Sequence, residues 1–235
     1  MLTSLKTLSL KDLLDIAQKK FGELVFEPIT VGPTTVEVLQ IKDLEAYIDK
    51  LVNSSPKKIE LPFWAKIWPT SIVLSLFIQR LNPNGKELLE LGCGVGVCGL
   101  FAAKHGFRVT LSDINEDALL FSQINILKNK LEDKAKVEKI DFTKDDLGKR
   151  YDIILGSEIL YSDKDYENIY HFLNKHIKED GEVIIGKEQD IKAKRFFELA
   201  HQSFNILQKN ISLKSEQEGY LCTIYRFLPK KHDSA

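Results

Sequence analysis

The stretch KELLELGCGVGVCGLFAAKHG, residues 86–106, decides the fold. Its first part, KELLELG, is a short apolar run that predicts a buried strand, and VCGLFAAKHG predicts a helix that ends at Gly106. The glycine-rich turn between them lets a ligand approach bare backbone, beside the unpaired N–H groups at the start of a helix. The stretch therefore predicts a strand, a ligand-binding turn and a helix in succession.

The same alternation continues toward the C-terminus. Further strands are predicted at 107–115, 135–142, 151–161 and 181–188, and further helices at 116–130, 166–181 and 191–204. Apolar runs such as DIILG (152–156) and EVIIG (182–186) are typical of strands covered on both faces, and helical connections favour a parallel sheet. We therefore predict a doubly wound α/β domain.

The two ends of the chain depart from this alternation. An antiparallel hairpin at 205–228, turning at 215–219, is predicted to close the domain. The N-terminal part is predicted to hold a helix at 10–20, a hairpin at 23–41 turning at Gly32-Pro33, an amphipathic helix at 42–52 and a linker at 53–58. We predict a small α+β appendage at 1–60, the main domain at 61–228 and a tail at 229–235.

The composition fits one soluble domain with an appendage. The chain has 235 residues, which leaves room for a larger α/β core. Its formal net charge is -1 and it has no long basic run, so nucleic acid is not favoured as a partner. The N-terminus lacks the continuous apolar core of a signal peptide or membrane span. We expect a cytoplasmic protein without a membrane partner.

Cysteine and histidine spacing gives no sign of a metal site or a disulfide framework. The three cysteines, Cys93, Cys98 and Cys222, form no CxxC pair, and the five histidines show no paired ligand spacing. We therefore predict no bound metal.

The glycine loop fits two patterns. Gly94, Gly96 and Gly99 fit the GxGxxG of dinucleotide enzymes, whereas Glu90 followed by Gly92, Gly94 and Gly96 fits an acidic-x-Gly-x-Gly-x-Gly pattern. The loop alone leaves both a dinucleotide and another nucleoside ligand open.

Acidic residues at the ends of the next two strands strengthen the prediction of a nucleoside site. Asp113 ends the strand that follows the loop, where a carboxylate can accept hydrogen bonds from a ribose diol. Asp141 and Phe142 end the third strand, where a carboxylate and an aromatic ring could hold an adenine. The alternatives are that Asp113 caps the helix starting near Asn115 and that Phe142 belongs to the core.

Residues 60–228 resemble the seven-strand, class I methyltransferases that use S-adenosylmethionine. The resemblance rests on ELGCGVG (90–96), LSDIN (111–115), IDF (140–142), the strand order and the closing hairpin. It implies a Rossmann-like, mostly parallel seven-strand sheet, with S-adenosylmethionine as cofactor and S-adenosylhomocysteine as product. The hairpin also weighs against an oxidoreductase, which would need a further substrate domain.

The resemblance also implies which residues bind the cofactor. The loop contributes Glu90, Gly92, Cys93, Gly94 and Gly96 beside the methionine moiety. Asp113 and Ile114 would lie at the ribose, Asp141 and Phe142 at the adenine, and Ser157 would touch the cofactor through its backbone.

Within that superfamily, the chain resembles more closely the protein-lysine methyltransferases with a [DE]xx[YF] motif after the fourth strand. WAKIWPTSIVLS (64–75) and IILGSEILYSDKDY (153–166) carry this resemblance. It implies that Trp68 forms a wall of the cofactor site, just before a helix with Pro69 in its first turn. Trp64 is expected to pack on the substrate side or against the N-terminal appendage.

The [DE]xx[YF] motif places Glu158 and Tyr161 as the candidate catalytic residues. Glu158 could orient a lysine ammonium beside the cofactor, and Tyr161 could offer an aromatic wall and a hydroxyl acceptor to the same amine. The family usually has Asp at the position of Glu158. The alternative is that Glu158 caps its loop and Tyr161 packs against the sheet.

The predicted activity is therefore methyl transfer from S-adenosylmethionine to a lysine amine of a protein. A small amine or other metabolite as substrate, a dinucleotide oxidoreductase and a non-catalytic cofactor-binding module are the alternatives. The sequence GSEILY (156–161) replaces the [ND]PP[YFW] of adenine and glutamine methyltransferases. Residues 1–60 are a candidate substrate cover, while the target, the number of methyl groups and the oligomeric state are left open.

Overall fold

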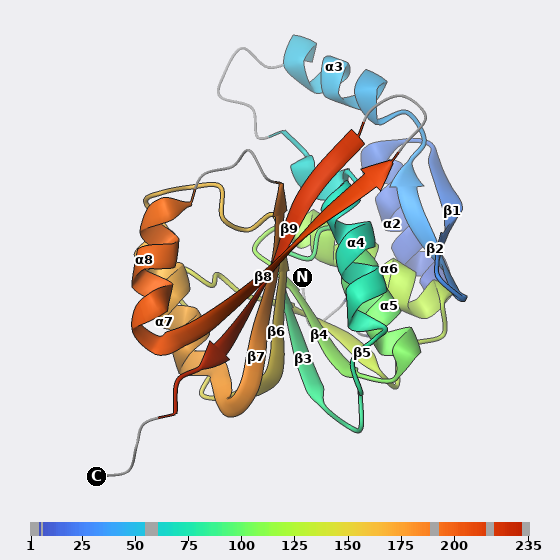
Figure 1. Cartoon of the computed structure of the whole chain (residues 1–235). Coiled ribbons are helices and arrows are strands. Elements are labelled where there is room, and N and C mark those ends of the chain that lie inside the picture. Colours follow the sequence, from blue (N-terminus) through green and yellow to red (C-terminus); the bar gives the residue numbers. More distant parts are fainter. Residues whose placement is uncertain (1–4, 6, 55–60, 189–192, 215–218, 232–235) are drawn as a thin grey trace.

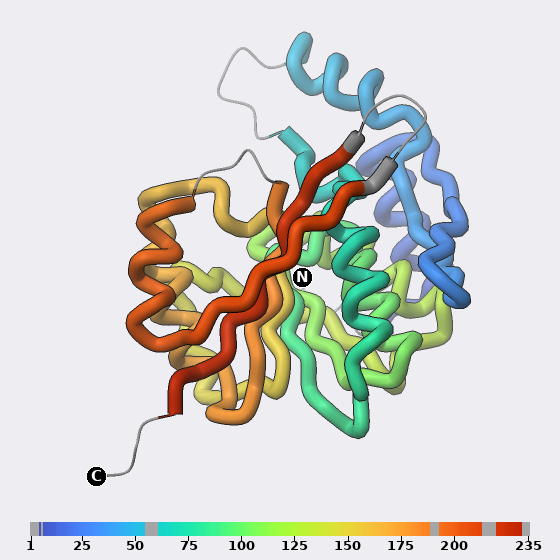
Figure 2. The backbone as a smooth tube through the Cα atoms, viewed as in Figure 1, coloured from blue at the N-terminus to red at the C-terminus, as the bar shows by residue number. Residues whose placement is uncertain are grey.

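The computed structural model describes residues 5, 7–54, 61–188, 193–214 and 219–231 (Figure 2). Residues 215–218 of the turn predicted at 215–219, and residues 55–58 of the linker predicted at 53–58, lie outside the described residues. So do the first residues of the helix predicted at 191–204.

A seven-stranded sheet forms the centre of the molecule, in the order β5-β4-β3-β6-β7-β9-β8 (Figure 1). The strands are β3 (Glu87–Leu91), β4 (Arg108–Asp113), β5 (Ala135–Lys139), β6 (Tyr151–Ser157), β7 (Ile177–Glu188), β8 (Phe204–Lys214) and β9 (Gly219–Pro229). The first five strands in the order run parallel, and β9 pairs antiparallel with both of its neighbours, β7 and β8. The predicted fold class, including the closing hairpin, is confirmed.

Helices cover both faces of the sheet (Figure 1). One face packs against α4 (Pro69–Ile78), α5 (Val97–His105) and α6 (Glu116–Lys128), and the other against α7 (Tyr166–His176) and α8 (Lys194–Ser203). Neighbouring residues of a strand alternate between the two cores, because successive side chains point to opposite faces. Leu88 belongs to the first core and Leu89 to the second.

The N-terminal part packs against the first of these cores. It consists of α2 (Leu10–Phe21), β1 (Leu24–Val31), β2 (Thr34–Ile41) and α3 (Leu44–Ser54). On α6, the side chain of Asn125 accepts a hydrogen bond from the backbone N–H of Leu39 at 2.7 Å, and that of Asn129 accepts one from Glu37 at 2.9 Å. The hairpin β1–β2 is therefore fixed to α6 by backbone groups.

One predicted helix is too long. The helix predicted at 166–181 ends at His176, and Ile177 is already the first residue of β7, paired with Tyr151. The residues that follow Ile177 are polar, so they supply no apolar side chain at helical spacing. Ile177 itself is buried in the core. Strand pairing therefore prevails over the helical pattern at this point.

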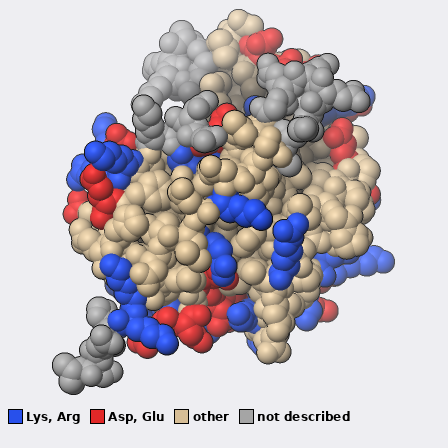
Figure 3. Space-filling model, viewed as in Figure 1, with Lys and Arg blue, Asp and Glu red and all other residues tan. Residues whose placement is uncertain are grey.

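Among the described residues, no helix has both the length and the apolar character needed to cross a membrane. The face shown in Figure 3 carries basic and acidic side chains close together along its lower and left edges.

Candidate active site

The candidate site lies where the parallel strands β3, β4 and β6 end. Carboxyl ends of neighbouring parallel strands meet at one edge of a sheet, which is where ligands bind in open α/β sheets. The glycine loop follows β3, Asp113 ends β4, and Ser157 and Glu158 lie at the end of β6.

The loop after β3 requires glycine. Gly92, Gly94 and Gly96 have φ angles of 60°, 54° and 86°, in the left-handed region that other residues rarely adopt. A Cβ on Gly94 would lie 2.7 Å from the carbonyl oxygen of Trp64. The loop thus passes directly beneath the chain segment that precedes α4. Cys93 of this loop is buried, and its N–H donates to the carbonyl oxygen of Ser112 at 2.9 Å.

Glu90 supports the glycine loop from below. Its side chain is buried, and its Oε2 accepts a hydrogen bond from the N–H of Gly99 at 2.8 Å. Burial raises the pKa of Glu90 to about 8, so the side chain is mostly neutral at neutral pH. A Cβ on Gly99 would lie 2.6 Å from the same Oε2. The glycine at position 99 is therefore explained by its packing against the Glu90 side chain.

Asp113 is held beside the glycine loop. Its Oδ2 accepts a hydrogen bond from the N–H of Gly94 at 3.0 Å, and its Oδ1 accepts one from Asn115 at 2.9 Å. Burial raises the pKa of the carboxyl, and the backbone donors oppose this rise. Asn115, rather than Asp113, caps α6 by accepting from Asp117 and Ala118. Ile114, beside it, is 55% exposed.

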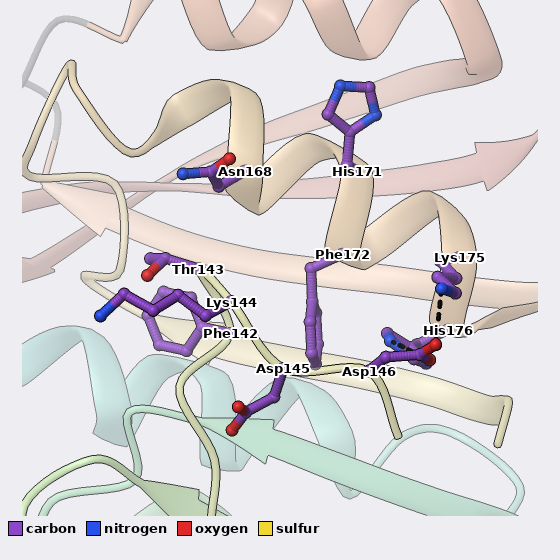
Figure 4. A pocket seen from close by; sticks show the side chains of 10 residues that line it. All are labelled: Phe142, Thr143, Lys144, Asp145, Asp146, Asn168, His171, Phe172, Lys175 and His176. Carbon is purple, nitrogen blue, oxygen red and sulfur yellow. Dashed lines mark hydrogen bonds and ion pairs between the residues drawn. The ribbon is translucent and has the colours of Figure 1, made fainter. Parts of the chain in front are cut away.

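The side chains of Asp141 and Phe142 contact groups outside the glycine loop. Asp141 accepts hydrogen bonds from the N–H and hydroxyl of Thr143 and forms an ion pair with Lys144 at 2.9 Å. The ring of Phe142 lies 6.5 Å from that of Phe172 on α7. It lines a cavity of about 170 Å³ that shares none of its described lining residues with the glycine loop (Figure 4).

Trp68 and Pro69 form the start of α4 as the sequence predicts. Pro69 is the first helical residue and Trp68 immediately precedes it. The indole N–H of Trp68 donates to the carbonyl oxygen of Phe63 at 3.2 Å, and the Lys66 ammonium lies 4.7 Å from the indole ring centre. These contacts hold the Trp68 ring, which is only partly buried.

Trp64 packs against the N-terminal part, one of the two expected positions. Its ring lies 5.6 Å from that of Phe21 on α2 and 5.0 Å from that of Phe121 on α6. The aromatic cluster joins the N-terminal helix to the segment that covers the glycine loop.

Glu158 is the most constrained residue of the site. It has a φ of 56°, and its N–H donates to the carbonyl oxygen of Gly186 at 2.9 Å. Its Oε1 accepts hydrogen bonds from three donors, which are the Thr70 hydroxyl, the N–H of Glu188 at 2.8 Å and the Tyr220 hydroxyl at 3.2 Å. Its Oε2 is buried without a partner among the described groups. Burial raises the pKa of this carboxyl.

Tyr161, the last residue of the motif, and Ser157, the residue before Glu158, differ in exposure. Tyr161 is 75% exposed, so it does not pack against the sheet as the structural alternative required. The hydroxyl of Ser157 is buried and, like Glu158 Oε2, has no partner among the described groups. Two unpaired polar atoms therefore lie next to each other in the sequence at the end of β6.

Sequence reasoning missed the partners of Glu158. Thr70 lies within the quoted Trp-Pro segment, so its position next to the site had a signal in the sequence. The backbone of Glu188 reaches Glu158 through the pairing of β6 with β7, and Tyr220 reaches it through the pairing of β7 with β9. No local pattern marks either contact.

The sequence is similar to those of known protein methyltransferases. A family model described as lysine methyltransferase matches residues 62–203. The "Histidine protein methyltransferase 1 homolog" of Dictyostelium discoideum is 30% identical over 154 residues, which are 63% of this chain and 49% of that protein. The "Histone-arginine methyltransferase METTL23" of Mus musculus is 31% identical over 137 residues, which are 52% of this chain and 53% of that protein. The chain spans about half the length of these relatives.

A solved structure agrees with the fold. The N-methyltransferase NodS from Bradyrhizobium japonicum WM9, in complex with S-adenosyl-L-homocysteine, matches with a TM-score of 0.58 at 16% identity. The match covers 81% of this chain and 100% of that one. At this identity the likeness shows the fold alone. The family model, in contrast, matches more than half of the sequence, and the chain belongs to the lysine methyltransferase family.

Proposed function

We propose that this chain transfers the methyl group of S-adenosylmethionine to a nitrogen of a protein side chain, with a lysine amine as the first candidate. The observation that carries the proposal is the meeting of the glycine loop, Asp113 and Glu158 at the ends of three adjacent strands, where Glu158 keeps one oxygen unpaired. Family membership supports the same reaction class and argues against the alternative of a dinucleotide oxidoreductase.

The residues at the strand ends fit the cofactor. Each oxygen of Asp113 holds one backbone N–H, and a carboxylate can accept about four hydrogen bonds, so it can still receive a ribose diol. The glycine loop exposes backbone at the start of α5, and we assign the wall of the site to Trp68 and Ser157. The sulfonium of S-adenosylmethionine supplies an activated methyl group when it is bound. The contribution of the protein is then to place the acceptor nitrogen in line.

The assignment of the adenine to Asp141 and Phe142 stays a prediction. Phe142 packs toward α7, and the Asp141 carboxylate is occupied by Thr143 and Lys144. The backbone of this segment, rather than these side chains, is the better candidate for contact with the adenine.

Glu158 is proposed to accept a hydrogen bond from the substrate nitrogen. A lysine amine has an ordinary pKa near 10.4, and a neighbouring carboxylate raises it further, so Glu158 orients the amine rather than removing its proton. The ammonium loses its proton to water before the nitrogen lone pair attacks the methyl group. Arginine would prefer two parallel hydrogen bonds to both carboxylate oxygens. Because Oε1 already has three hydrogen-bond partners, only Oε2 is left, and the site favours a side chain that can bind through one N–H at a time, as a lysine amine can.

A histidine side chain is the second candidate acceptor. Its neutral ring has one N–H, so the one free oxygen of Glu158 suits it equally well. A relative at 30% identity carries the name of a histidine protein methyltransferase. Small amines remain the alternative class.

Exposed apolar side chains support a protein substrate. Phe63, Ile114 and Tyr161 are 62%, 55% and 75% exposed, and each belongs to a segment that borders the candidate site. A protein substrate that contacted these three side chains would cover apolar surface that is now exposed to water. We propose that residues 1–60 add to this surface as a cover. Figure 1 shows α3 above the upper ends of β8 and β9.

Labelling tests the proposal. The protein is incubated with methyl-tritiated S-adenosylmethionine and a cell extract, and label is measured in protein and in small molecules. We expect label in protein, on lysine after amino-acid analysis, and loss of label with Glu158→Ala. Label only in small molecules would refute the protein substrate, and label on arginine would refute the role assigned to the free oxygen.

Thermal unfolding separates the cofactor from the substrate. S-adenosylhomocysteine should raise the melting temperature, since a ligand of the folded state stabilises it, and NAD should not. A shift with NAD alone would refute the cofactor assignment.

A further inference from the structure

The side chain of Glu158 is held by three elements that lie outside its own loop. Thr70 reaches it from α4, the backbone of Glu188 from β7 and Tyr220 from β9. All three groups converge on Oε1, and the hydroxyls of Thr70 and Tyr220 also lie within hydrogen-bond distance of each other. Since each hydroxyl has one proton, either both donate to Oε1 or one donates to the other and the other donates to Oε1. One oxygen is therefore saturated.

The packing around Gly186 brings Thr70 close enough for this contact. A Cβ on Gly186 would lie 2.6 Å from Cγ2 of Thr70 and 2.9 Å from Leu74. The carbonyl oxygen of the same glycine accepts the N–H of Glu158. A residue with a side chain at this position would push α4 and Thr70 away, so the close approach is part of the fold.

The second carboxylate oxygen of Glu158, Oε2, has no such partners in the described part of the chain. Glu158 Oε2 is buried and has no hydrogen-bond partner among the described groups. Buried acceptors are nearly always paired, and an exception requires an explanation, of which a catalytic role is one. With Oε1 saturated, Oε2 is the oxygen that remains to receive a donor.

We propose that Tyr220 and Thr70 are positioning residues, which hold Glu158 by Oε1 so that Oε2 receives the N–H of the substrate. The inference rests on the proposed methyl transfer and deepens it. It gives the closing β8–β9 hairpin a part in the reaction, because Tyr220 is the second residue of β9. Neither side chain touches the reacting atoms.

The titratable groups that face Glu158 are few in the described part of the chain. They are Glu188 on β7 and Tyr220 and Cys222 on β9. The contact from α4 is Thr70, which does not titrate. Removing either hydroxyl takes a donor from the carboxylate form, so the pKa of Glu158 should rise in Thr70→Val and in Tyr220→Phe.

Two measurements test the proposal. The first is the titration of the Glu158 side-chain carboxyl by carbon-13 NMR, with the signal assigned from its loss in Glu158→Gln. The second is the initial rate of tritium transfer to a cell extract between pH 6 and pH 9, together with calorimetric affinity for S-adenosylhomocysteine. Matched controls are Tyr225→Phe, on the same strand, and Thr223→Val, which loses a buried hydroxyl bonded to Asn210.

The expected result is specific to the two positioning residues. In Thr70→Val and Tyr220→Phe, Glu158 should titrate at higher pH, the rate should fall roughly tenfold or more, and its acidic limb should move upward. Affinity for S-adenosylhomocysteine should stay within about twofold of wild type, as expected when only substrate positioning is lost. Thr70→Ser, which keeps the hydroxyl, should restore most of the rate. Both controls should behave as wild type.

Three outcomes would overturn the proposal or its basis. An unchanged Glu158 titration in both variants would refute the contact. A changed titration with an unchanged rate and pH profile would make the contact purely structural. A wild-type protein that binds S-adenosylhomocysteine but labels nothing would refute the proposed function, while the NMR arm would still report on the contact itself.

Discussion

Gly94→Ala places a methyl group where the structure has no room for one. Gly94 has a φ of +54°, and an added Cβ would lie 2.7 Å from the carbonyl oxygen of Trp64. The left-handed backbone costs an alanine about 1–2 kcal/mol, and overpacking against main chain adds about 1–3 kcal/mol. The free energy of unfolding should therefore fall by about 2–5 kcal/mol. The melting temperature should drop by roughly 4–20 °C for a chain of this size.

Gly148→Ala is the matched control for this substitution. Gly148 has a φ of +58°, but nothing lies within 4 Å of an added Cβ, so only the backbone cost applies. Urea denaturation of both variants isolates the contact with Trp64. Because the N–H of Gly94 donates to Asp113, Gly94→Ala should also weaken S-adenosylhomocysteine binding at least tenfold, measured by calorimetry. Equal losses of stability in the two variants, with binding intact, would refute this account of the loop.

Three further predictions concern the site and its support. Asp113→Ala should abolish the calorimetric heat of S-adenosylhomocysteine, and a retained heat would remove the ribose assignment. The folded-state pKa of Glu90, about 8, lies above its ordinary 4.5. Its stabilising contribution is therefore present below about pH 4.5 and is lost, by a few kcal/mol, as pH rises toward 8. Glu90→Gln should flatten this dependence in denaturant titrations, and an unchanged slope would contradict it. Trp64→Ala should lower the free energy of unfolding by about 3–5 kcal/mol, whereas Trp68→Ala should mainly weaken cofactor binding. A large loss of stability in Trp68→Ala together with weaker cofactor binding in Trp64→Ala would contradict these two roles.

The fold could be predicted because its information is local. The apolar runs of β3, β6 and β7 have no polar face, which indicates strands covered on both sides, and the glycine loop marks the first strand–helix junction. The end of α7 could not be predicted, since the strand from Ile177 onward depends on pairing with Tyr151 across the sheet. Pairing of this kind leaves no periodic trace in the residues themselves.

The candidate site could be predicted only in outline. Asp113 and Glu158 follow strands, so the topology alone brings them to one edge. The direction of Phe142 is set by α7 and by the local hydrogen bonds of Asp141, which propensity and spacing do not contain. The saturation of one Glu158 oxygen depends on three distant elements, so only the folded chain reveals it.

The contact of the Trp64 backbone with the glycine loop links two events. The chain at 63–65 touches Gly94 at one residue and exposes Phe63 at the next. A partner that grips Phe63 and shifts this segment must change the loop, and a nucleoside that stiffens the loop must stiffen the segment. By linkage, each ligand then alters the affinity for the other by the same factor.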